Sequence, residues 1–275
     1  MQEKAMRSFY LNRTTIDNID SLARETKQKK MEIVEQAIDI TYKIHILSKV
    51  WGLGSDDEIT ILLSDFGGRS SYPDGRTEYQ EYNNPNLEGS VQAIGHIAPN
   101  ISLANNNKKI NIYTHRFPIE FHGNLICVGG PKSNEVTKYF LTRTDLKFKG
   151  TFKNDALLIG EDVRNTMTDE NGNVGEGCGY RTKFDAEKKH IIEDFGLLLK
   201  VSNPLERKNT IIIIAGCRAF GTGGAARVVS DYRLTRELID KLKNNCRYFI
   251  AVVEVFVIND VIVNVDIVKA EPIEN

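Results

Sequence analysis

Two short apolar runs constrain the fold of this chain more than any other feature. Residues 125–128 and 211–215 are apolar at every position, and residues 59–63 form a third run that is interrupted only by Thr60. A strand that is apolar on both faces is typical of the centre of a sheet that helices cover on each side. The three runs therefore predict an α/β fold.

A glycine-rich segment follows each of the two apolar runs. GGPKSN follows residues 125–128 and GCRAFGTGG follows residues 211–215, and helices are predicted over 135–141 and 225–243, the latter with a break near Asp231. Glycine lets backbone amides approach a phosphate, and the N-terminus of a following helix favours negative charge. In an open α/β sheet such loops lie at the carboxyl ends of strands, where ligands bind. The predicted ligand-binding residues are Gly129, Gly130, Lys132, Ser133, Asn134, Arg218, Gly221, Thr222 and Gly223.

These loops exclude two common nucleotide-binding motifs. The spacing from Gly216 to Gly221 is that of a triphosphatase phosphate loop, but Thr222 stands where lysine is required. No G-x-G-x-x-G follows a predicted strand, which disfavours NAD oxidoreductase chemistry. The segments VGGPKSN and AGCRAFGTGGAA are similar in style to the loops of Rossmann-like nucleotide sensors of the SLOG type. This resemblance implies a small anionic, nucleotide-like ligand, whereas turn geometry alone is the other explanation of the glycines.

The last part of the chain predicts antiparallel strands. Residues 195–201 read as a strand that turns through 202–209 into the run at 211. Residues 248–258 and 261–268 are two β-patterns joined at Asn259-Asp260, a good hairpin turn. Lys and Glu on that edge would discourage aggregation. We therefore expect a Rossmann-like mixed-sheet domain over residues 55–275 with an antiparallel edge.

The first 50 residues predict a separate small unit. Residues 7–12 alternate as a strand with Phe9 and Leu11 on one face, and Thr14 or Thr15 is predicted to cap the first helix. A polar turn at 26–30 leads to a second helix, which ends at Gly52 because glycine readily adopts a left-handed cap. This unit is too small to bury its own core, and a lone strand leaves backbone groups unpaired. Both defects vanish if two copies pair their strands and interlock their helices.

The segment RSFYLNRTTIDNIDSLARETKQKKMEIVEQAIDI resembles the ribbon-helix-helix family of bacterial and phage repressors. The resemblance covers about 40 residues, and Lys27-Gln28 replaces the glycine often found in that family's turn. It implies that paired strands enter the major groove of DNA with outward side chains reading base edges. Arginines and lysines beside the strand and the free amides that open the second helix would bind phosphates. The predicted DNA-binding residues are Arg7, Ser8, Tyr10, Asn12, Arg13, Lys29 and Lys30.

The charge distribution leaves the role of this unit open. The whole chain has a net charge of −1, and residues 1–50 carry nine Lys or Arg and seven Asp or Glu, which gives this segment +2. DNA binding therefore requires the positive charges to cluster, as they do near residues 4–13 and 27–30. The alternative is a dimerisation arm that never touches DNA.

The sequence predicts neither a metal site nor a catalytic group. Its four cysteines lie far apart without a C-x-x-C pair, and its five histidines form no H-E-x-x-H pattern. Asp162, Glu176 and Asp194 are a candidate acid cluster for general acid–base chemistry, and Cys178 lies between glycines. Acidic residues in polar loops are usually solvated, and Cys178 has no histidine nearby in sequence to activate it.

No run of about 18 apolar residues is present, and the N-terminus lacks an apolar signal region, so we expect a cytoplasmic protein. Our interpretation is a homodimeric, ligand-responsive repressor or other transcription regulator that binds double-stranded operator DNA and senses a small anionic ligand. One alternative is a nucleotide-processing enzyme, such as an NAD glycohydrolase, whose N-terminal unit serves only for oligomerisation. The other is an interaction or defence protein held in a larger oligomer by that unit.

Overall fold

The computed structural model describes residues 12–54, 56, 58–64, 70–71, 77–78, 85–105, 108–114, 122–143, 151–153, 156–158, 179–187, 190–243 and 247–273. The chain divides into two compact units, which we call the head (Met1–His45) and the body (Ile46–Asn275). The division lies inside a helix rather than at the glycines near residue 52, where the sequence predicted it. The reason is that Ile46, Leu47, Val50 and Trp51 are buried in the core of the body.

The described part of the head consists of helical segments. Helix α1 spans Arg13–Thr26, and helix α2 spans Lys30–Trp51 and continues into the body. Asn12 caps α1, because its Oδ1 accepts hydrogen bonds from the N–H and the hydroxyl of Thr15, each at 2.9 Å. The prediction of a cap at Thr14 or Thr15 is therefore wrong. The helix ends at Lys27, whose φ of 56° gives the left-handed conformation more often supplied by glycine.

The body is a mixed α/β unit. Its helices are α3 (Pro85–Ala104), α4 (Glu135–Arg143), α6 (Ala219–Val228) and α7 (Tyr232–Lys241). The strands of its main sheet are β1 (Glu58–Leu63), β4 (Lys109–Thr114), β5 (Asn124–Val128), β9 (Lys183–Phe184), β10 (Ile191–Ser202), β11 (Thr210–Gly216), β12 (Phe249–Ile258) and β13 (Val261–Pro272). Two smaller sheets contain β2 (Ser70–Ser71) with β3 (Thr77–Glu78), and β6 (Thr151–Lys153), β7 (Ala156–Leu158) and β8 (Tyr180–Arg181).

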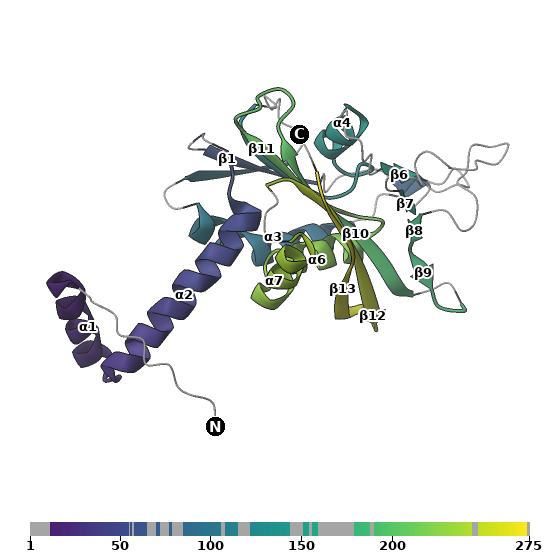
Figure 1. Ribbon diagram of the computed structural model, residues 1–275. Helices are drawn as coiled ribbons and strands as arrows, with labels where there is room; N and C mark the ends of the chain where they lie inside the picture. Colours follow the sequence, from purple (N-terminus) through teal and green to yellow (C-terminus); the bar gives the residue numbers. More distant parts are fainter. Residues whose placement is uncertain are drawn as a thin grey trace. The chain divides into compact units, whose positions relative to one another are not determined.

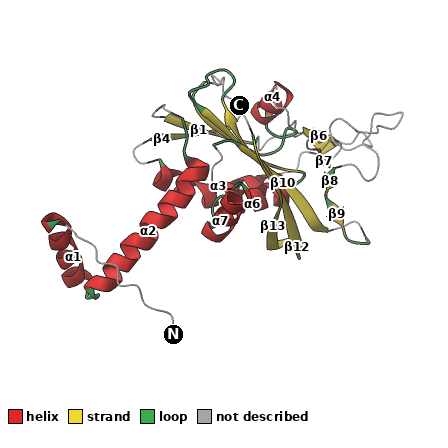
Figure 2. Ribbon diagram, in the orientation of Figure 1, coloured by secondary structure: helices red, strands yellow, loops and turns green. Residues whose placement is uncertain are grey.

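The main sheet has the order β13-β12-β10-β11-β5-β1-β4, and β9 pairs with β10. The half formed by β4, β1, β5 and β11 is parallel, and the half formed by β11, β10, β12 and β13 is antiparallel. In Figure 2 the strands of this main sheet are drawn in yellow, as are those of the smaller sheets. The predicted α/β fold with a mixed sheet and an antiparallel edge is therefore confirmed, and the β10–β11 and β12–β13 hairpins form as expected.

Helices cover both faces of this sheet (Figure 1). Helices α3, α6 and α7 pack on one face together with the last turns of α2, where the larger apolar core lies. Val136, Phe140 and Leu141 of α4 pack on the other face, against residues of β5, β10 and β11. Burial on both faces explains why β5 and β11 are apolar at nearly every position.

The end of α2 is tied to the body by hydrogen bonds from three side chains. The indole N–H of Trp51 donates to the carbonyl of Val229 at 2.8 Å, and Asn105 donates to the carbonyl of Trp51 at 2.9 Å. The buried Lys200 of β10 donates to the carbonyl of Lys49 at 3.1 Å, as suits a cation at a helix C-terminus.

Two local predictions near helix ends are wrong. Gly52 does end α2, but it does not have the positive φ of a left-handed cap. Its N–H donates to the carbonyl of Ser48 at 2.6 Å, and a Cβ there would collide with the same oxygen. The helix predicted to begin at 225 begins earlier, since α6 starts at Ala219. The predicted break near Asp231 is confirmed, because Asp231 caps α7 through bonds to the N–H groups of Arg233 and Leu234.

No helix in the described part of the chain combines the length and the apolar character needed to cross a bilayer. The predicted strand at 7–12 lies outside the described residues, apart from Asn12.

Candidate functional site

The candidate ligand site lies where the parallel strands β1, β5 and β11 end. From β1 the chain crosses to β4 on one side, and from β5 it later reaches β11 on the other side, so the order of strands reverses between β1 and β5. Ligands of open α/β sheets bind beyond the carboxyl ends of strands at such a switch point. The segments that follow these strands begin at Ser64, Gly129 and Cys217.

The segment after β5 has a backbone conformation that requires glycine. Gly129 has a φ of +111°, and a Cβ at this position would collide with the hydroxyl oxygen of Ser64. Its N–H donates to the carbonyl of Ile214 in β11 at 2.8 Å. The turn then closes through the carbonyl of Gly130, which accepts from the N–H groups of Ser133 and Asn134 at 3.0 and 2.9 Å. The β5 loop is thus packed against the ends of both neighbouring strands.

Two hydroxyl groups meet beneath this loop. Ser64, which directly follows β1, lies 2.9 Å from Ser133, measured between the two Oγ atoms. The Ser64 hydroxyl also donates to the carbonyl of Val128 at 3.2 Å, and that of Ser133 donates to the carbonyl of Gly130 at 3.3 Å. Ser64 is buried and Ser133 is half-buried, so of the two only Ser133 presents surface to a ligand.

Asn134 was predicted to contact the ligand, but its side chain is committed inside the fold. It is fully buried, and its amide group donates to the carbonyls of Leu62 and Val128, both at 3.1 Å. Its Oδ1 accepts from the N–H groups of Val136 and Thr137, also at 3.1 Å, and so caps α4. These four bonds use both donors and both acceptor sites of an asparagine side chain. Asn134 therefore holds the loop and α4 in place.

The second predicted loop is largely helix, and its anion-binding end is occupied by a carboxylate of the protein itself. Asp194 of β10 is fully buried and accepts from the N–H of Gly221 at 2.6 Å and from the hydroxyl of Thr182 at 2.7 Å. The N–H groups of Phe195 and Arg218 also bond to it. Negative charge is stabilised at a helix N-terminus, so Asp194 fills the place in which we predicted a phosphate.

Burial raises the pKa of Asp194 to about 6. The hydrogen bonds from Thr182 and from the amides of Gly221, Phe195 and Arg218 act in the opposite direction, because they stabilise the charged form. At neutral pH, Asp194 is therefore mainly ionised and bonded to α6. Asp162 and Glu176, the other members of the predicted acid cluster, lie outside the described residues.

The predicted contacts Gly221, Thr222 and Gly223 lie inside α6 and are buried. A Cβ on Gly221 would collide with the carbonyl of Phe195, so this glycine allows the helix to approach β10 closely. Gly223 faces Ile262, whose Cδ1 would lie 3.3 Å from an added Cβ, and the N–H of Thr222 donates to the carbonyl of Arg218. The prediction that these residues form a phosphate loop is corrected: they pack a helix onto a sheet.

Lys132 and Arg218 are the charged residues of the predicted ligand site, and both are exposed. Lys132 belongs to the turn after β5, and Arg218 is the N-cap residue of α6 after β11. Because β5 and β11 are parallel neighbours, the two loops begin at the same edge of the sheet. A Cβ on Gly130 would lie 3.1 Å from the carbonyl oxygen of Gly216, which shows that the loop after β5 packs against the end of β11.

The head shows which predicted DNA contacts are already used within it. Arg7, Ser8 and Tyr10 lie outside the described residues. Asn12 was predicted to contact DNA, but its Oδ1 caps α1, so in this conformation it cannot also make the bidentate contact with adenine that an asparagine side chain can form. Arg13 is exposed in the first turn of α1.

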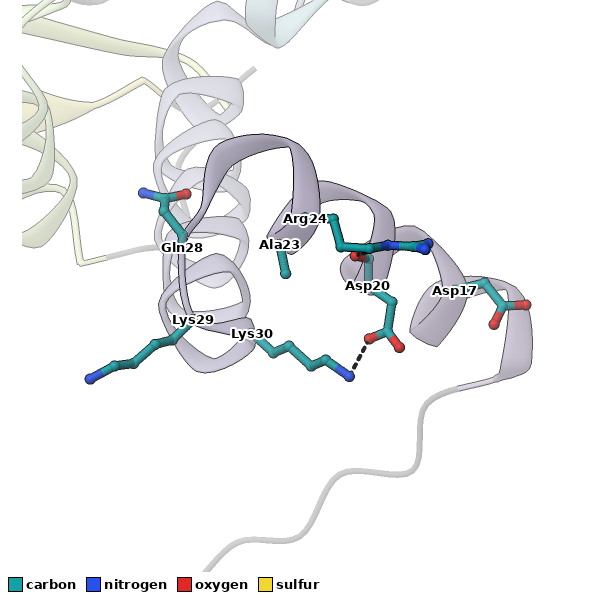
Figure 3. A pocket seen from close by; sticks show the side chains of 7 residues that line it. All are labelled: Asp17, Asp20, Ala23, Arg24, Gln28, Lys29 and Lys30. Carbon is teal, nitrogen blue, oxygen red and sulfur yellow. Dashed lines mark hydrogen bonds and ion pairs between the residues drawn. The ribbon is translucent and has the colours of Figure 1, made fainter.

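The basic turn between α1 and α2 borders an open hollow of about 750 Å³ (Figure 3). Its lining residues are Asp17, Asp20, Ala23, Arg24, Gln28, Lys29 and Lys30. Lys30 pairs with Asp20 at 2.6 Å. The N–H of Lys29, the residue before α2, donates to the carboxylate of Glu32 at 3.2 Å, so this amide is already used.

The sequence reasoning missed the structural importance of Ser64 and the capping role of Asp194. A serine directly after a predicted strand was the available signal for Ser64. No local signal marks Asp194 as a cap, because it bonds to a helix far away in the sequence. Among the described residues, no group of three or more His, Cys, Asp or Glu is placed to hold a metal ion.

Comparison of the chain with protein-family models, with curated proteins and with solved structures finds no match. The resemblances to ribbon-helix-helix repressors and to SLOG-type sensors therefore stay predictions.

Proposed function

We propose that the chain is a cytoplasmic, homodimeric transcription regulator. Its head binds double-stranded DNA, and its body binds a small anionic, nucleotide-like ligand at the switch point between β1 and β5. The observation that carries the proposal is the apolar surface of the head. The head exposes Ile16, Leu22, Met31, Ile38, Ile40 and Tyr42 by 44–66% of their surface.

Dimerisation explains this apolar surface. Met31, Ile38 and Tyr42 recur at spacings that bring them to one side of α2, and Ile16 and Leu22 lie on the amphipathic α1. Water contact with so much aliphatic surface is unfavourable, and contiguous apolar patches mark interaction sites. A second copy of the head offers a matching apolar surface, as the resemblance to intertwined ribbon-helix-helix dimers implies.

DNA binding is proposed for the strand region and the start of α1. Arg7, Ser8 and Tyr10 are the proposed readers of bases and phosphates, and Arg13 is an exposed cation directly beside them in the sequence. The basic turn contributes less than its sequence suggests, because Lys30 pairs with Asp20 and Glu32 adds negative charge to the first turn of α2. We therefore expect phosphate contacts mainly from Arg7 and Arg13.

The ligand is proposed to bind through side chains and loop backbone at Gly129, Gly130, Lys132, Ser133 and Arg218. The N-termini of α4 and α6 already have internal partners, Asn134 and Asp194. The anionic part of the ligand would therefore be held by the two cationic side chains rather than by a helix dipole. This arrangement favours binding with moderate affinity and easy release, which suits a sensor.

Selection from a random duplex library, followed by fluorescence anisotropy over a range of salt concentrations, tests the DNA part. We expect salt-dependent binding whose slope of log K against log salt falls in magnitude by about 2 in Arg13→Ala, because each of the two subunits loses one phosphate contact. Tyr10→Ala should alter the selected sequence. Lys241→Ala on α7 of the body is the control, and binding that is absent or insensitive to salt rejects the proposal.

Thermal-shift and calorimetric titration with common nucleotides tests the ligand part. At least one nucleotide should bind the wild type, and Lys132→Ala and Arg218→Ala should each weaken its binding by about tenfold, as expected for loss of a charge-assisted hydrogen bond. Lys241→Ala should not. If no nucleotide binds, or if neither variant has an effect, the site is not at this edge.

No described residue favours the alternative of a nucleotide hydrolase. Asp194 has a raised pKa, but its side chain is fully buried and already accepts four hydrogen bonds. It therefore presents no surface to a substrate. Turnover of NAD by the purified protein would nevertheless decide for the enzyme.

A further inference from the structure

Strand β13 lies at the edge of the main sheet and has one side open among the described residues. It is 12 residues long, and β12 is the described strand that pairs with it. An edge strand of this length presents a row of backbone N–H and C=O groups that can pair with another strand. The question is whether its side chains block such pairing or select a partner.

The open strand carries apolar residues that the core does not use. The β12–β13 pairing shifts register twice, and each shift leaves one extra residue on β13, Val263 and Val268. These two valines are 51% and 44% exposed, and Val261 at the hairpin tip is 60% exposed. Edge strands that avoid pairing usually place charged residues or proline at such positions. Exposed valines at both bulges indicate instead that this edge is covered by a partner.

The two faces of β13 differ in character. Val265, Ile267 and Ala270 face the larger core. The opposite face is polar, where Asn264 donates to Asp266 at 2.9 Å and Lys269 pairs with Glu271 at 3.2 Å. Asp266 and Lys269 share this face. Their partners on β12 are Glu254 and Val252, which lie two residues apart and so point to the same side of the sheet, the side of the smaller core that contains Val252.

We propose that β13 pairs antiparallel with β13 of a second copy of this chain, about a two-fold axis between Ile267 and Val268. In this register Asp266 of one copy lies opposite Lys269 of the other, and Asn264 lies opposite Glu271. On the other face Val265 lies opposite Ala270. All of these pairs are complementary in charge, hydrogen bonding or apolar character, and each occurs twice by symmetry.

The charges allow this register and oppose two alternatives. Moving the axis by one residue toward the C-terminus places Asp266 opposite Glu271, and centring it on Asp266 places that carboxylate against its own symmetry mate. Both arrangements bring like charges together across the strands, which is unfavourable. The charged residues of this edge thus favour the proposed register over these two alternatives rather than prevent pairing altogether.

This contact is independent of the proposed DNA and ligand binding, because it involves β13 alone. It is also a second interface in addition to the one proposed for the head. Loss of head dimerisation would therefore leave it intact, and the two proposals can fail separately.

Charge exchange in the full-length protein tests the register. Asp266→Lys turns two attractive pairs into two repulsive ones, so self-association measured by sedimentation velocity should weaken by roughly tenfold or more. Lys269→Asp should do the same, and the double variant D266K/K269D should restore association. Glu237→Lys on α7, an exposed site with the same change of charge, is the matched control.

Cysteine cross-linking tests the position of the axis. Val268 and its symmetry mate should lie about 6 Å apart between Cα atoms, within reach of a disulfide. Val268→Cys should therefore form a disulfide-linked dimer under mild oxidation, and D266K in the same chain should reduce it. Val261→Cys, which is more exposed but far from the axis, and the wild type are the controls.

The proposal is overturned if the single charge variants associate as the wild type does, or if the double variant fails to restore association. It is also overturned if Val268→Cys cross-links no faster than Val261→Cys.

Discussion

The head and the body use apolar residues in opposite ways. Within residues 12–45, Ile33 is the one apolar side chain that is buried, and six large apolar side chains are exposed. The described part of the body buries apolar residues on both faces of its sheet, in two cores. Both regions contain regular secondary structure, so local helix formation does not distinguish them. The difference shows that the described part of the body buries cores of its own, whereas the described residues of the head leave most of their apolar side chains in contact with solvent.

The largest effect of a substitution on stability is expected at Trp51, which lies on α2 but belongs to the core of the body. Trp51→Ala should lower the free energy of unfolding by about 3–5 kcal/mol, because the side chain is fully buried and its N–H bonds to Val229. Urea unfolding followed by circular dichroism measures this loss. Trp51→Phe should cost clearly less, since it keeps much of the volume. A loss below about 1 kcal/mol for alanine would show that the end of α2 is not part of the core.

The next largest effect concerns the packing of α6 on β10. Gly221→Ala should destabilise the body by about 1–3 kcal/mol or more, because the added methyl group meets the carbonyl of Phe195. Gly95→Ala is the matched control, since Gly95 lies in α3 with open space around it. That variant should stabilise the protein by about 0.5–1 kcal/mol through better helix propensity. Equal effects of the two substitutions would contradict close packing at Gly221.

Asp194 makes the stability of the body depend on pH. Burial raises the pKa of Asp194 to about 6 from its ordinary value of 3.8, so the folded state binds a proton more tightly than the unfolded chain does. The contribution to stability is fully present below pH 4 and is lost as the pH rises through 6. We expect the wild type to lose roughly 1–3 kcal/mol relative to Asp194→Asn between pH 4 and pH 7. Chemical unfolding at several pH values measures it, and a constant difference between the two proteins would refute this assignment.

The smallest effect on the body is expected from the exposed face of the head. Ile38→Asp should change the unfolding free energy of the body by no more than about 0.5 kcal/mol, because Ile38 is 54% exposed and lies outside the body. The same substitution should reduce self-association through the head, which sedimentation at low concentration can follow. A large loss of body stability would mean that folding of the body depends on the head. It would contradict the conclusion that the body buries cores of its own.

Much of the body could be predicted from the sequence because its strands carry local signals. The apolar runs at β1, β5 and β11 and the β-patterns at β12 and β13 locate these strands to within a few residues. The hairpin turn at Asn259-Asp260 is equally local, since both residues adopt the positive φ that such turns require. The mixed sheet followed from these elements.

The candidate site could be predicted only in part. The sequence identified the loops that follow β5 and β11, and the structure brings them together at one edge. It did not reveal that Asn134 and Asp194 occupy the N-termini of α4 and α6. A glycine that lets a phosphate approach the backbone and a glycine that lets a neighbouring strand approach it look the same in the local sequence. Only the tertiary contact distinguishes the two roles.

By itself the sequence indicated most strands of the main sheet and helix α4, because periodicity, glycine and turn residues act over a few positions along the chain. Only the tertiary structure decided where α6 begins and what its N-terminus binds, because the deciding group, the carboxylate of Asp194, comes from a strand distant in sequence. Burial also decided that α2 continues into the body, since the cavity that receives Trp51 is built from residues of other elements.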